Sequence, residues 1–151
     1  MKLIIAADHR GFKLKEALKA RLVAAGHDVE DIGAHALDPE DDYPDFGYPA
    51  AQMVAAAPGA KGILVCGSGI GMDVVANKVK GVRATVISSI DGAIHASSRD
   101  GVNVITLGAD TLTEDQAFDI VQAFLTTPLI QEEKYTRRLQ KIALIEGEYL
   151  R

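Results

Sequence analysis

Short apolar runs alternate along the chain with segments in which apolar residues recur every three or four positions. The short runs are typical of buried strands, and the periodic segments are typical of amphipathic helices. This alternation predicts successive βαβ units and therefore a parallel sheet. The expected strands are KLIIAAD at 2–8, HDVEDIG at 27–33, KGILVC at 61–66, VRATVISS at 82–89 and NVITLG at 103–108.

Helices are expected between these strands and in two segments after the last one. The first expected helix, between the first and second strands, lies between Gly11 and Gly26, because its apolar residues share one face and glycine commonly ends a helix. Residues 34–49 are acidic, rich in proline and aperiodic, which is typical of a surface loop. Thr113 and Gln116 form a candidate capping box at the start of a helix. The other helices are expected at about 48–57, at 72–79, at 91–99 and from about 132 to 148.

The length and composition are those of one α/β domain covering 1–151. With 151 residues, of which 48% are hydrophobic, the chain can bury a sizeable core. The formal net charge is −5 and the charges are mixed along the chain, so nothing indicates a nucleic-acid or membrane surface. The apolar start ends at Asp8 and no later apolar segment is long enough to span a bilayer, which predicts a cytoplasmic protein.

The predicted fold is a single doubly wound five-stranded parallel sheet, Rossmann-like or flavodoxin-like, with strand order 2-1-3-4-5. In such sheets ligands bind beyond the carboxyl ends of the strands, where the chain order reverses. That point lies between the first and third expected strands. The segments expected there are Asp8-His9-Arg10 and Cys66-Gly67-Ser68-Gly69-Ile70-Gly71.

The sequence CGSGIG at 66–71 predicts a loop whose N–H groups converge on one small volume. Together with the positive end of the following helix, such a loop favours an anion. Met72 stands where a dinucleotide-binding fingerprint needs glycine and where a cysteine-dependent phosphatase loop needs arginine. The Gly-Lys-Ser/Thr close of a Walker loop is also absent. The remaining interpretation is a hole for a developing oxyanion.

Cys66 is the single cysteine of the chain, so no internal disulfide can form. The residue is either a small buried apolar side chain at the end of a core strand or a thiol that moves a proton. Asp8, His9 and Ser68 are expected to face the same crevice, which would bring a carboxylate, an imidazole and a hydroxyl to the thiol. This combination favours the catalytic interpretation.

Four segments resemble the ribose-5-phosphate isomerase type B and galactose-6-phosphate isomerase family: AADHRGFKLKEAL, DDYP, GILVCGSGIGMDVVANKVKGVRA and NVITLG. The resemblance spans nearly the whole chain in order, and its most specific parts are D-H-x-G-[FY]-x-L-K and C-G-[ST]-G-x-G followed by A-N-K. It implies a flavodoxin-like sheet and a homodimer, or a tetramer, in which the C-terminal helix is exchanged. It also implies interconversion of aldose and ketose phosphates through a cis-enediolate, without metal or organic cofactor, with ribose 5-phosphate of the pentose phosphate pathway as the expected substrate.

The resemblance further implies a role for each site residue. Cys66 would be the base that removes the proton next to the carbonyl, Ser68 would help to move a proton between the two oxygens, and Asp8 would bind sugar hydroxyls or assist ring opening. The N–H groups of the loop would hold the enediolate. The implied substrate-binding residues are His9, Tyr43, Gly67, Gly69, Ile70, Gly71, Arg99 and Asp100, with Lys134 and Arg138 reaching into the site of the partner subunit.

Three residues depart from the pattern of this family. Arg99 and Asp100 replace a His-Asn pair whose histidine is thought to open the furanose ring. Asp110 stands where an arginine often binds phosphate, and Arg10, Arg99 and Arg137 are the candidates to restore the missing charge. The sequence therefore leaves the identity of the substrate undecided. The alternatives are an isomerase of a tetrose or hexose phosphate and a non-catalytic phosphosugar-binding module.

Overall fold

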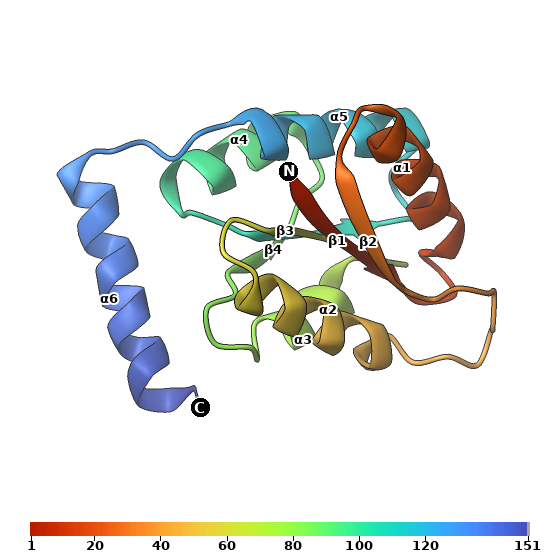
Figure 1. The fold of residues 1–151 in the computed structure, drawn as a ribbon, viewed down its shortest axis with the longest axis horizontal. Coiled ribbons are helices and arrows are strands. Elements are labelled where there is room, and N and C mark those ends of the chain that lie inside the picture. Colours follow the sequence, from red (N-terminus) through yellow and green to blue (C-terminus); the bar gives the residue numbers. More distant parts are fainter. Residues whose placement is uncertain (151) are drawn as a thin grey trace.

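The computed structural model describes residues 1–150 of the chain. Within these residues, one parallel sheet carries helices on both faces (Figure 1), which confirms the predicted α/β class. The strands are β1 (Lys2–Ala7), β2 (Asp28–Gly33), β3 (Lys61–Cys66), β4 (Ala84–Val86) and β5 (Val104–Gly108). The helices are α1 (Phe12–Ala24), α2 (Pro44–Ala56), α3 (Ile70–Ala76), α4 (Ile90–Arg99), α5 (Glu114–Thr126) and α6 (Glu133–Tyr149).

The order of the strands is β2-β1-β3-β5-β4, so the predicted order 2-1-3-4-5 is wrong for the last two strands. All five residues of β5 are buried, whereas the three residues of β4 are only half-buried. A fully apolar strand is stabilised by cover on both faces, and a short half-buried strand tolerates the sheet edge. As a result β5 lies directly beside β3, with Cys66 paired to Gly108.

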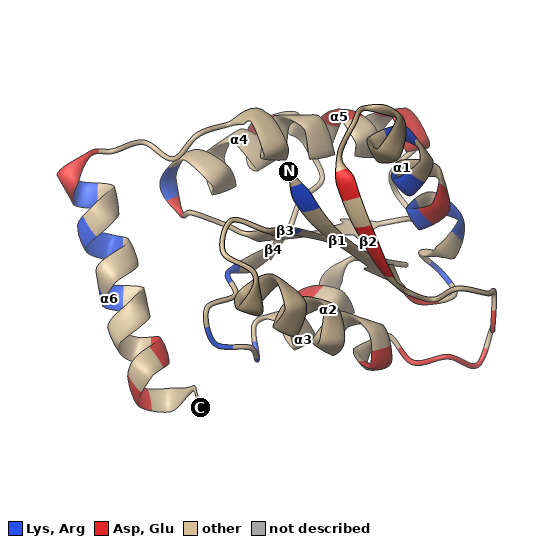
Figure 2. Ribbon diagram, viewed as in Figure 1, with Lys and Arg blue, Asp and Glu red and all other residues tan. Residues whose placement is uncertain are grey.

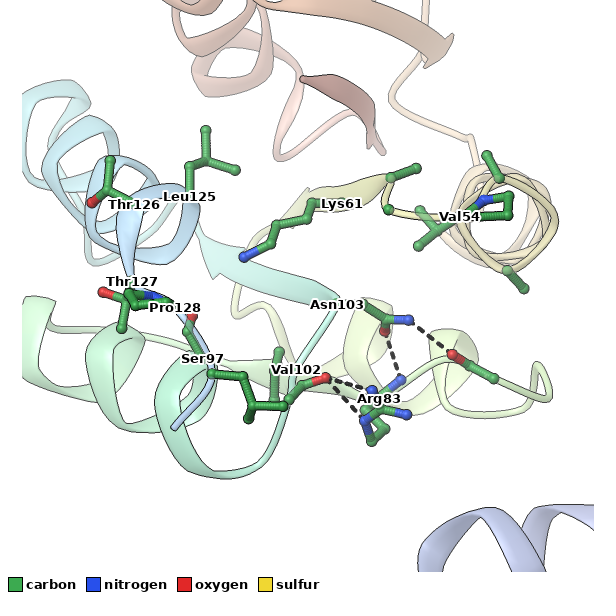
Figure 3. A pocket seen from close by; sticks show the side chains of 18 residues that line it. Val54, Lys61, Arg83, Ser97, Val102, Asn103, Leu125, Thr126, Thr127 and Pro128 are labelled. Carbon is green, nitrogen blue, oxygen red and sulfur yellow. Dashed lines mark hydrogen bonds between the residues drawn. The ribbon is translucent and has the colours of Figure 1, made fainter. Parts of the chain in front are cut away.

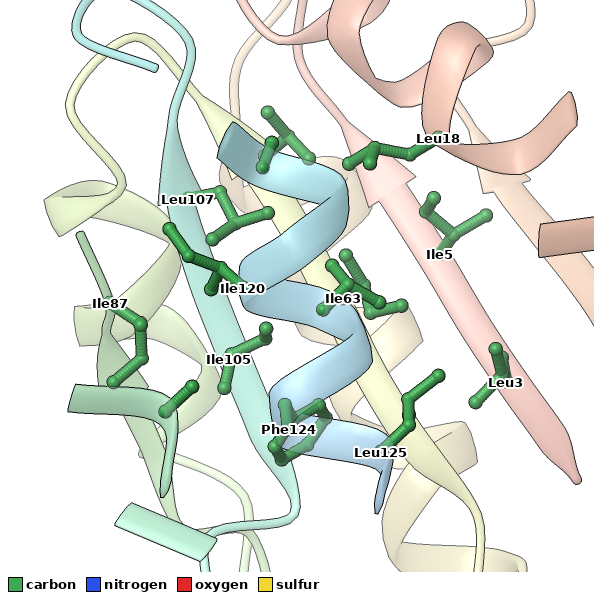
Figure 4. Close-up of a cluster of buried hydrophobic side chains, with 14 of the residues drawn as sticks. Leu3, Ile5, Leu18, Ile63, Ile87, Ile105, Leu107, Ile120, Phe124 and Leu125 are labelled. Atoms are coloured by element: carbon green, nitrogen blue, oxygen red, sulfur yellow. The ribbon is translucent and has the colours of Figure 1, made fainter. Parts of the chain in front are cut away.

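The helices form two layers, with α1, α4 and α5 on one face of the sheet and α2 and α3 on the other (Figure 1). Alternate residues of the central strands enter the two cores, so that Ile63 lies under α5 and Leu64 under α2 and α3. Figure 4 shows Phe124 and Ile120 of α5 lying across Ile105 of β5. This double cover explains why the central strands are mostly apolar rather than alternating.

Most predicted helix positions agree with the structure to within a few residues. The capping box of Thr113 and Gln116 is confirmed, with N–H to side-chain oxygen distances of 3.0 and 3.2 Å. The helix expected from about Tyr48 begins instead at Pro44, because proline needs no N–H partner in the first turn of a helix. Pro49 then lies inside this helix. Within residues 1–150, no helix is long and apolar enough to cross a membrane.

Helix α6 lies outside the two helical layers (Figure 1). Tyr135 is its buried residue, and Leu139 lies against Gly101 in the connection between α4 and β5. Leu144 and Ile145 are exposed although both are large and apolar. The exchange of this helix between subunits stays a prediction.

A buried lysine joins α1 to the end of β2. The side chain of Lys15 is fully buried, and its Nζ lies 2.8 and 2.9 Å from the two carboxylate oxygens of Asp31 and 2.6 Å from the carbonyl oxygen of Ala34. Lys19 also donates to Asp31, at 2.7 Å. Burial would raise the pKa of Asp31, but the hydrogen bonds from Lys15, Lys19 and the N–H of Gly33 together lower it. The contact with Ala34 fixes the start of the long loop that leads to α2.

We expect Asp31→Asn to lower the free energy of unfolding by at least about 2 kcal/mol, because it removes the buried carboxylate that pairs with the Lys15 ammonium and leaves only the partly exposed carboxylate of Glu16, at 2.7 Å. Urea unfolding measures the change. The matched control is Asp28→Asn, which removes an exposed carboxylate from the same strand and should change stability by less than about 0.5 kcal/mol. Equal effects of the two substitutions would show that the Lys15 pair contributes no particular stability.

The Lys15–Asp31 pair should make the free energy of unfolding depend on pH in the acidic range. The pKa of Asp31 in the folded chain is below its ordinary value of 3.8, so its contribution is fully present above that value and is lost as the pH falls through the folded pKa. The difference in unfolding free energy between wild type and Asp31→Asn should therefore shrink when unfolding is measured at progressively lower pH. A difference that stays constant down to the lowest pH would contradict the assignment.

Candidate active site

The glycine loop at 66–71 joins the end of β3 to the start of α3. Gly69 has a φ of 81°, in the left-handed region that favours glycine, and it caps α3. The loop is fastened to the end of β5, because the N–H of Ala109 donates to the carbonyl of Cys66 at 2.9 Å and the N–H of Asp110 donates to that of Gly67 at 3.0 Å. The predicted anion loop therefore has a fixed backbone shape.

Cys66 lies under this loop with 4% of its surface exposed. The N–H of Gly69 donates to its sulfur at 3.1 Å, and the N–H of Ile70 donates to the hydroxyl oxygen of the exposed Ser68 at 3.2 Å. A hydrogen bond from an N–H group to sulfur is stronger when the sulfur is a thiolate than when it is a thiol. Such a bond can therefore support the negative charge of a thiolate, which is the form in which a cysteine acts as a base.

The end of β1 brings Asp8 and His9 to the same edge of the sheet as Cys66, as the sequence predicted. Asp8 is buried, and one of its carboxylate oxygens accepts the N–H of Gly11 at 2.9 Å. A Cβ at Gly11 would overlap the carbonyl of Val65, so the start of α1 packs directly on β3. Asp8 thus shapes the turn that brings α1 beside the glycine loop.

His9 is held by Asp41, a residue that the sequence reasoning missed. One oxygen of Asp41 lies 2.9 Å from the backbone N of His9 and 2.6 Å from its Nδ1. The side chain of Asp41 is only 9% exposed, and within residues 1–150 its second oxygen has no hydrogen-bond partner. The bond to Asp41 raises the pKa of His9 above its ordinary value of 6.5. His9 is therefore kept as a cation to higher pH than an isolated histidine.

Tyr43 closes another side of the loop. Its ring lies about where a side chain at Gly71 would be, with ring carbons 2.9 to 3.1 Å from an ideal Cβ at that position. The absence of a side chain at Gly71 lets the partly exposed ring pack on the loop backbone. Tyr43 and Asp41 both come from the acidic segment after β2, so this segment forms one wall of the candidate site.

Arg10 and Asp110 form an ion pair at the same edge, between the side-chain Nη2 and Oδ2 atoms. The sequence left open which of three arginines restores the charge that Asp110 removes. Of these, Arg10 is the one that lies at the loop, because a Cβ at Gly67 would overlap its guanidinium. The carboxylate of Asp110 is therefore neutralised locally.

The remaining predicted site residues do not reach Cys66 within one chain. Arg99 and Asp100 end α4 and precede β5, so they lie at the amino edge of the sheet, whereas Cys66 pairs with the last residue of β5. Figure 2 shows the basic residues of the first turns of α6 on the separated helix. Lys134 is paired with Glu132 at 2.9 Å, and the guanidinium of Arg138 lies 5.8 Å from the centre of the Tyr135 ring.

A cavity of about 610 Å³ lies at the amino edge of the sheet (Figure 3). Lys61 donates to the carbonyl of Phe124 at 2.8 Å, and burial lowers its pKa. Arg83 donates to the carbonyl of Gly101 at 2.7 and 2.9 Å. These cations fasten the chain segments that surround the cavity. None of the predicted site residues lines it, so it is separate from the candidate active site.

Within the described residues, no cluster of three or more His, Cys, Asp or Glu side chains is arranged to hold a metal ion.

Known proteins resemble this chain over nearly its whole length. Ribose-5-phosphate isomerase B of Mycobacterium tuberculosis (strain H37Rv) is 37% identical over 146 residues, which are 97% of this chain and 90% of that protein. The structure of ribose-5-phosphate isomerase B from Mycoplasma genitalium with bound ribulose-5-phosphate is 36% identical and matches with a TM-score of 0.92 over 97% of both chains. Type B ribose 5-phosphate isomerase of Trypanosoma brucei is 40% identical, with a TM-score of 0.89 over 96% of this chain and 98% of that one.

The comparison with protein families agrees with these individual matches. The family model described as Ribose/Galactose Isomerase matches residues 3–142, which include every element from β1 to most of α6. The resemblance inferred from the sequence motifs is thereby confirmed. The chain belongs to the ribose/galactose isomerase family.

Proposed function

We propose that the protein is an aldose–ketose isomerase that interconverts ribose 5-phosphate and ribulose 5-phosphate through a cis-enediolate. The observation that carries this proposal is the buried sulfur of Cys66, which accepts the N–H of Gly69 inside a loop of backbone donors. A thiol that can lose its proton and a hole for an oxyanion are the two components needed for proton transfer next to a carbonyl. The names of the relatives, and the ribulose-5-phosphate bound to one of them, support the choice of substrate.

In the proposed reaction the Cys66 thiolate removes the proton from C2 of the open-chain aldose. The electron pair of the broken C–H bond forms the C1–C2 double bond, and the carbonyl electrons move onto O1. The N–H groups between Gly67 and Gly71 hold this oxygen, while Ser68 moves the proton of the C2 hydroxyl to O1. Cys66 then returns its proton to C1, which gives the ketose with no net change in protons or electrons.

The substrate would lie between the glycine loop and the residues that surround it. We assign Asp8 to the sugar hydroxyls, His9 to the phosphate end and Tyr43 to the side of the substrate. His9 suits an anion because Asp41 keeps it protonated over a wider range of pH. Since Arg99 stands where the family has a ring-opening histidine, a tetrose or hexose phosphate is the alternative substrate, and a binding module without catalysis is the alternative function.

A second copy of the chain would complete the site. Arg99 and Asp100 lie on the same side of one chain as α6, since Asp100 and Ile142 line one shallow cavity between α4 and α6. These segments cannot reach the Cys66 of their own chain, whereas the protruding α6 could carry Lys134 and Arg138 to a neighbour. We therefore propose a homodimer with sites shared between subunits; two-fold symmetric dimers are the commonest closed assemblies.

The most direct test is exchange of the C2 proton with deuterated solvent for a panel of aldose phosphates with four to six carbons. Ribose 5-phosphate should exchange and isomerise, and a chelator should leave the rate unchanged. Preferred turnover of a tetrose or hexose phosphate would reassign the substrate. No exchange with any member of the panel would favour the binding module.

Cys66→Ala should lower kcat by at least about 100-fold, which is the range for loss of a general base. The side chain is small and its replacement leaves the backbone loop in place, so thermal unfolding should change little by comparison. Ser68→Ala should cost less, because water can carry the proton between the two oxygens. Wild-type turnover in Cys66→Ala would disprove the base assignment and leave Asp8 as the candidate.

The role of Asp41 can be tested through the pH dependence of kcat/KM. The raised pKa of His9 means that its positive charge is complete at low pH and is lost as the pH rises through that pKa. Asp41→Asn should move the alkaline fall in kcat/KM for ribose 5-phosphate to lower pH, because the uncharged amide no longer favours the imidazolium. Asp42→Asn, which changes the neighbouring exposed carboxylate, should leave the profile in place. A fall at the same pH in both variants would remove His9 from this role.

Shared sites predict recovery of activity in mixed dimers. Arg138→Ala should raise KM about ten-fold or more, because a cation paired with phosphate contributes roughly 1.5 to 3 kcal/mol. Arg137→Ala is the control, since Arg137 is already paired with Glu133 at 2.6 and 2.7 Å. Mixing Arg138→Ala subunits with Cys66→Ala subunits should regenerate one intact site in each heterodimer. No recovery in verified heterodimers would confine each site to one chain.

A further inference from the structure

Arg10 crosses the end of β3 at the centre of the candidate site. It follows the last residues of β1, and its partner Asp110 follows the end of β5, so the ion pair joins the two strands that flank β3. The guanidinium occupies the space that a side chain at Gly67 would need. Because Gly67 has none, the guanidinium lies directly on the loop backbone, one residue from Cys66.

The surroundings of this pair indicate a binding role rather than a stabilising one. The side chains of Arg10 and Asp110 are 55% and 47% exposed, and exposed ion pairs contribute little to folding. A guanidinium has five N–H donors. Within residues 1–150, Arg10 donates to one carboxylate oxygen of Asp110. Asp110 thus fixes the orientation of the guanidinium while most of its donors are left for a ligand.

The charges that face this guanidinium favour an anion with more than one acceptor oxygen. His9 is the adjacent residue, and its hydrogen bond to Asp41 raises its pKa, so two basic side chains follow one another at the end of β1. Asp8 is buried and its carboxylate accepts the N–H of Gly11; after the bond to Asp41, its negative charge also helps to raise the pKa of His9. A phosphoryl group is matched by these donors because it presents several oxygens to a planar guanidinium.

We propose that Arg10, oriented by Asp110, binds the phosphoryl group of the substrate and thereby selects phosphorylated over unphosphorylated sugars. This inference rests on the proposed isomerase function and adds to it a specificity-determining residue. Asp110 does not repel the phosphoryl group in this arrangement, because its charge is compensated by Arg10.

Arg10→Gln tests the inference, since glutamine keeps a polar side chain and removes the charge. KM for ribose 5-phosphate should rise about ten-fold or more while kcat changes less than about three-fold, as expected for a contact equal in the ground and transition states. The inhibition constant of inorganic phosphate should rise by a similar factor. Arg21→Gln is the matched control, because Arg21 forms another exposed pair, with Asp115 at 2.8 Å, away from the site.

Exchanging the two charged residues of the pair tests whether phosphate binding needs a guanidinium at this place or needs an arginine at position 10 itself. Arg10→Asp should lose phosphate affinity, and adding Asp110→Arg to the same chain should recover part of it, because the guanidinium then extends from the other end of the same pair. Thermal unfolding of each variant checks that the fold is retained. Failure of the double variant to improve on Arg10→Asp, with both folded, would contradict the proposal.

Inorganic phosphate also separates this inference from the proposed function. Its binding to wild type and to Arg10→Gln can be measured by calorimetry without any turnover, and equal affinities would overturn the inference even if the enzyme isomerises ribose 5-phosphate normally. A loss confined to kcat would overturn it as well, since Arg10 would then act on the enediolate. Absence of isomerase activity in wild type would instead disprove the proposed function, while weaker phosphate binding by Arg10→Gln would still support the assigned contact.

Discussion

The parallel pairing of β3 with β1 on one side and with β5 on the other aligns the carboxyl ends of three strands at one edge of the sheet. Each candidate group at that edge depends on this alignment. The strands end at Ala7, Cys66 and Gly108, with Asp8 directly after the first, and the chain turns away from the sheet within a few residues of each. Buried apolar side chains on both faces hold the register, and Figure 4 shows those on the face that α5 covers. The relative positions of the thiol, the imidazole and the Arg10–Asp110 pair therefore follow from the core.

The glycines let other groups come close to the loop that this pairing creates. Gly67 makes room for the guanidinium of Arg10 and Gly71 for the ring of Tyr43. The hydrogen bonds from Ala109 and Asp110 hold the loop to β5, so these groups pack against a rigid surface. Lys15 likewise holds the acidic segment that forms a wall of the site, because its bond to the carbonyl of Ala34 fixes the start of the segment that carries Asp41 and Tyr43. Preorganisation of this kind is what a developing enediolate requires, since rigid donors need no rearrangement as charge forms.

Local sequence signals predicted the parts of this site that lie at the ends of strands. Apolar runs bounded by Asp8-His9 and by CGSGIG predicted both segments and the edge where they meet. The order of β4 and β5 was wrong because it depends on how fully each strand is buried, which a short apolar run does not reveal. Asp41 was missed because it is one of several acids in an aperiodic loop, and only the three-dimensional course of that loop brings it to His9. The pairing of Arg10 with Asp110 could likewise not be predicted from local sequence, since the two residues are 100 positions apart.

The direction of each crossover determines which residues can share a site within one chain. A helix that connects two parallel strands runs back along the sheet, so its last residues and the start of the next strand lie at the amino edge. Arg99 and Asp100 occupy that position, as does the connection from α5 to α6. The separation follows from topology and does not depend on the side chains, so no rearrangement of rotamers can bring these residues to their own Cys66. If they act on the substrate, they do so in the site of a second copy, and the protein then divides one reaction between a rigid edge that carries the thiol and a protruding helix that carries charge.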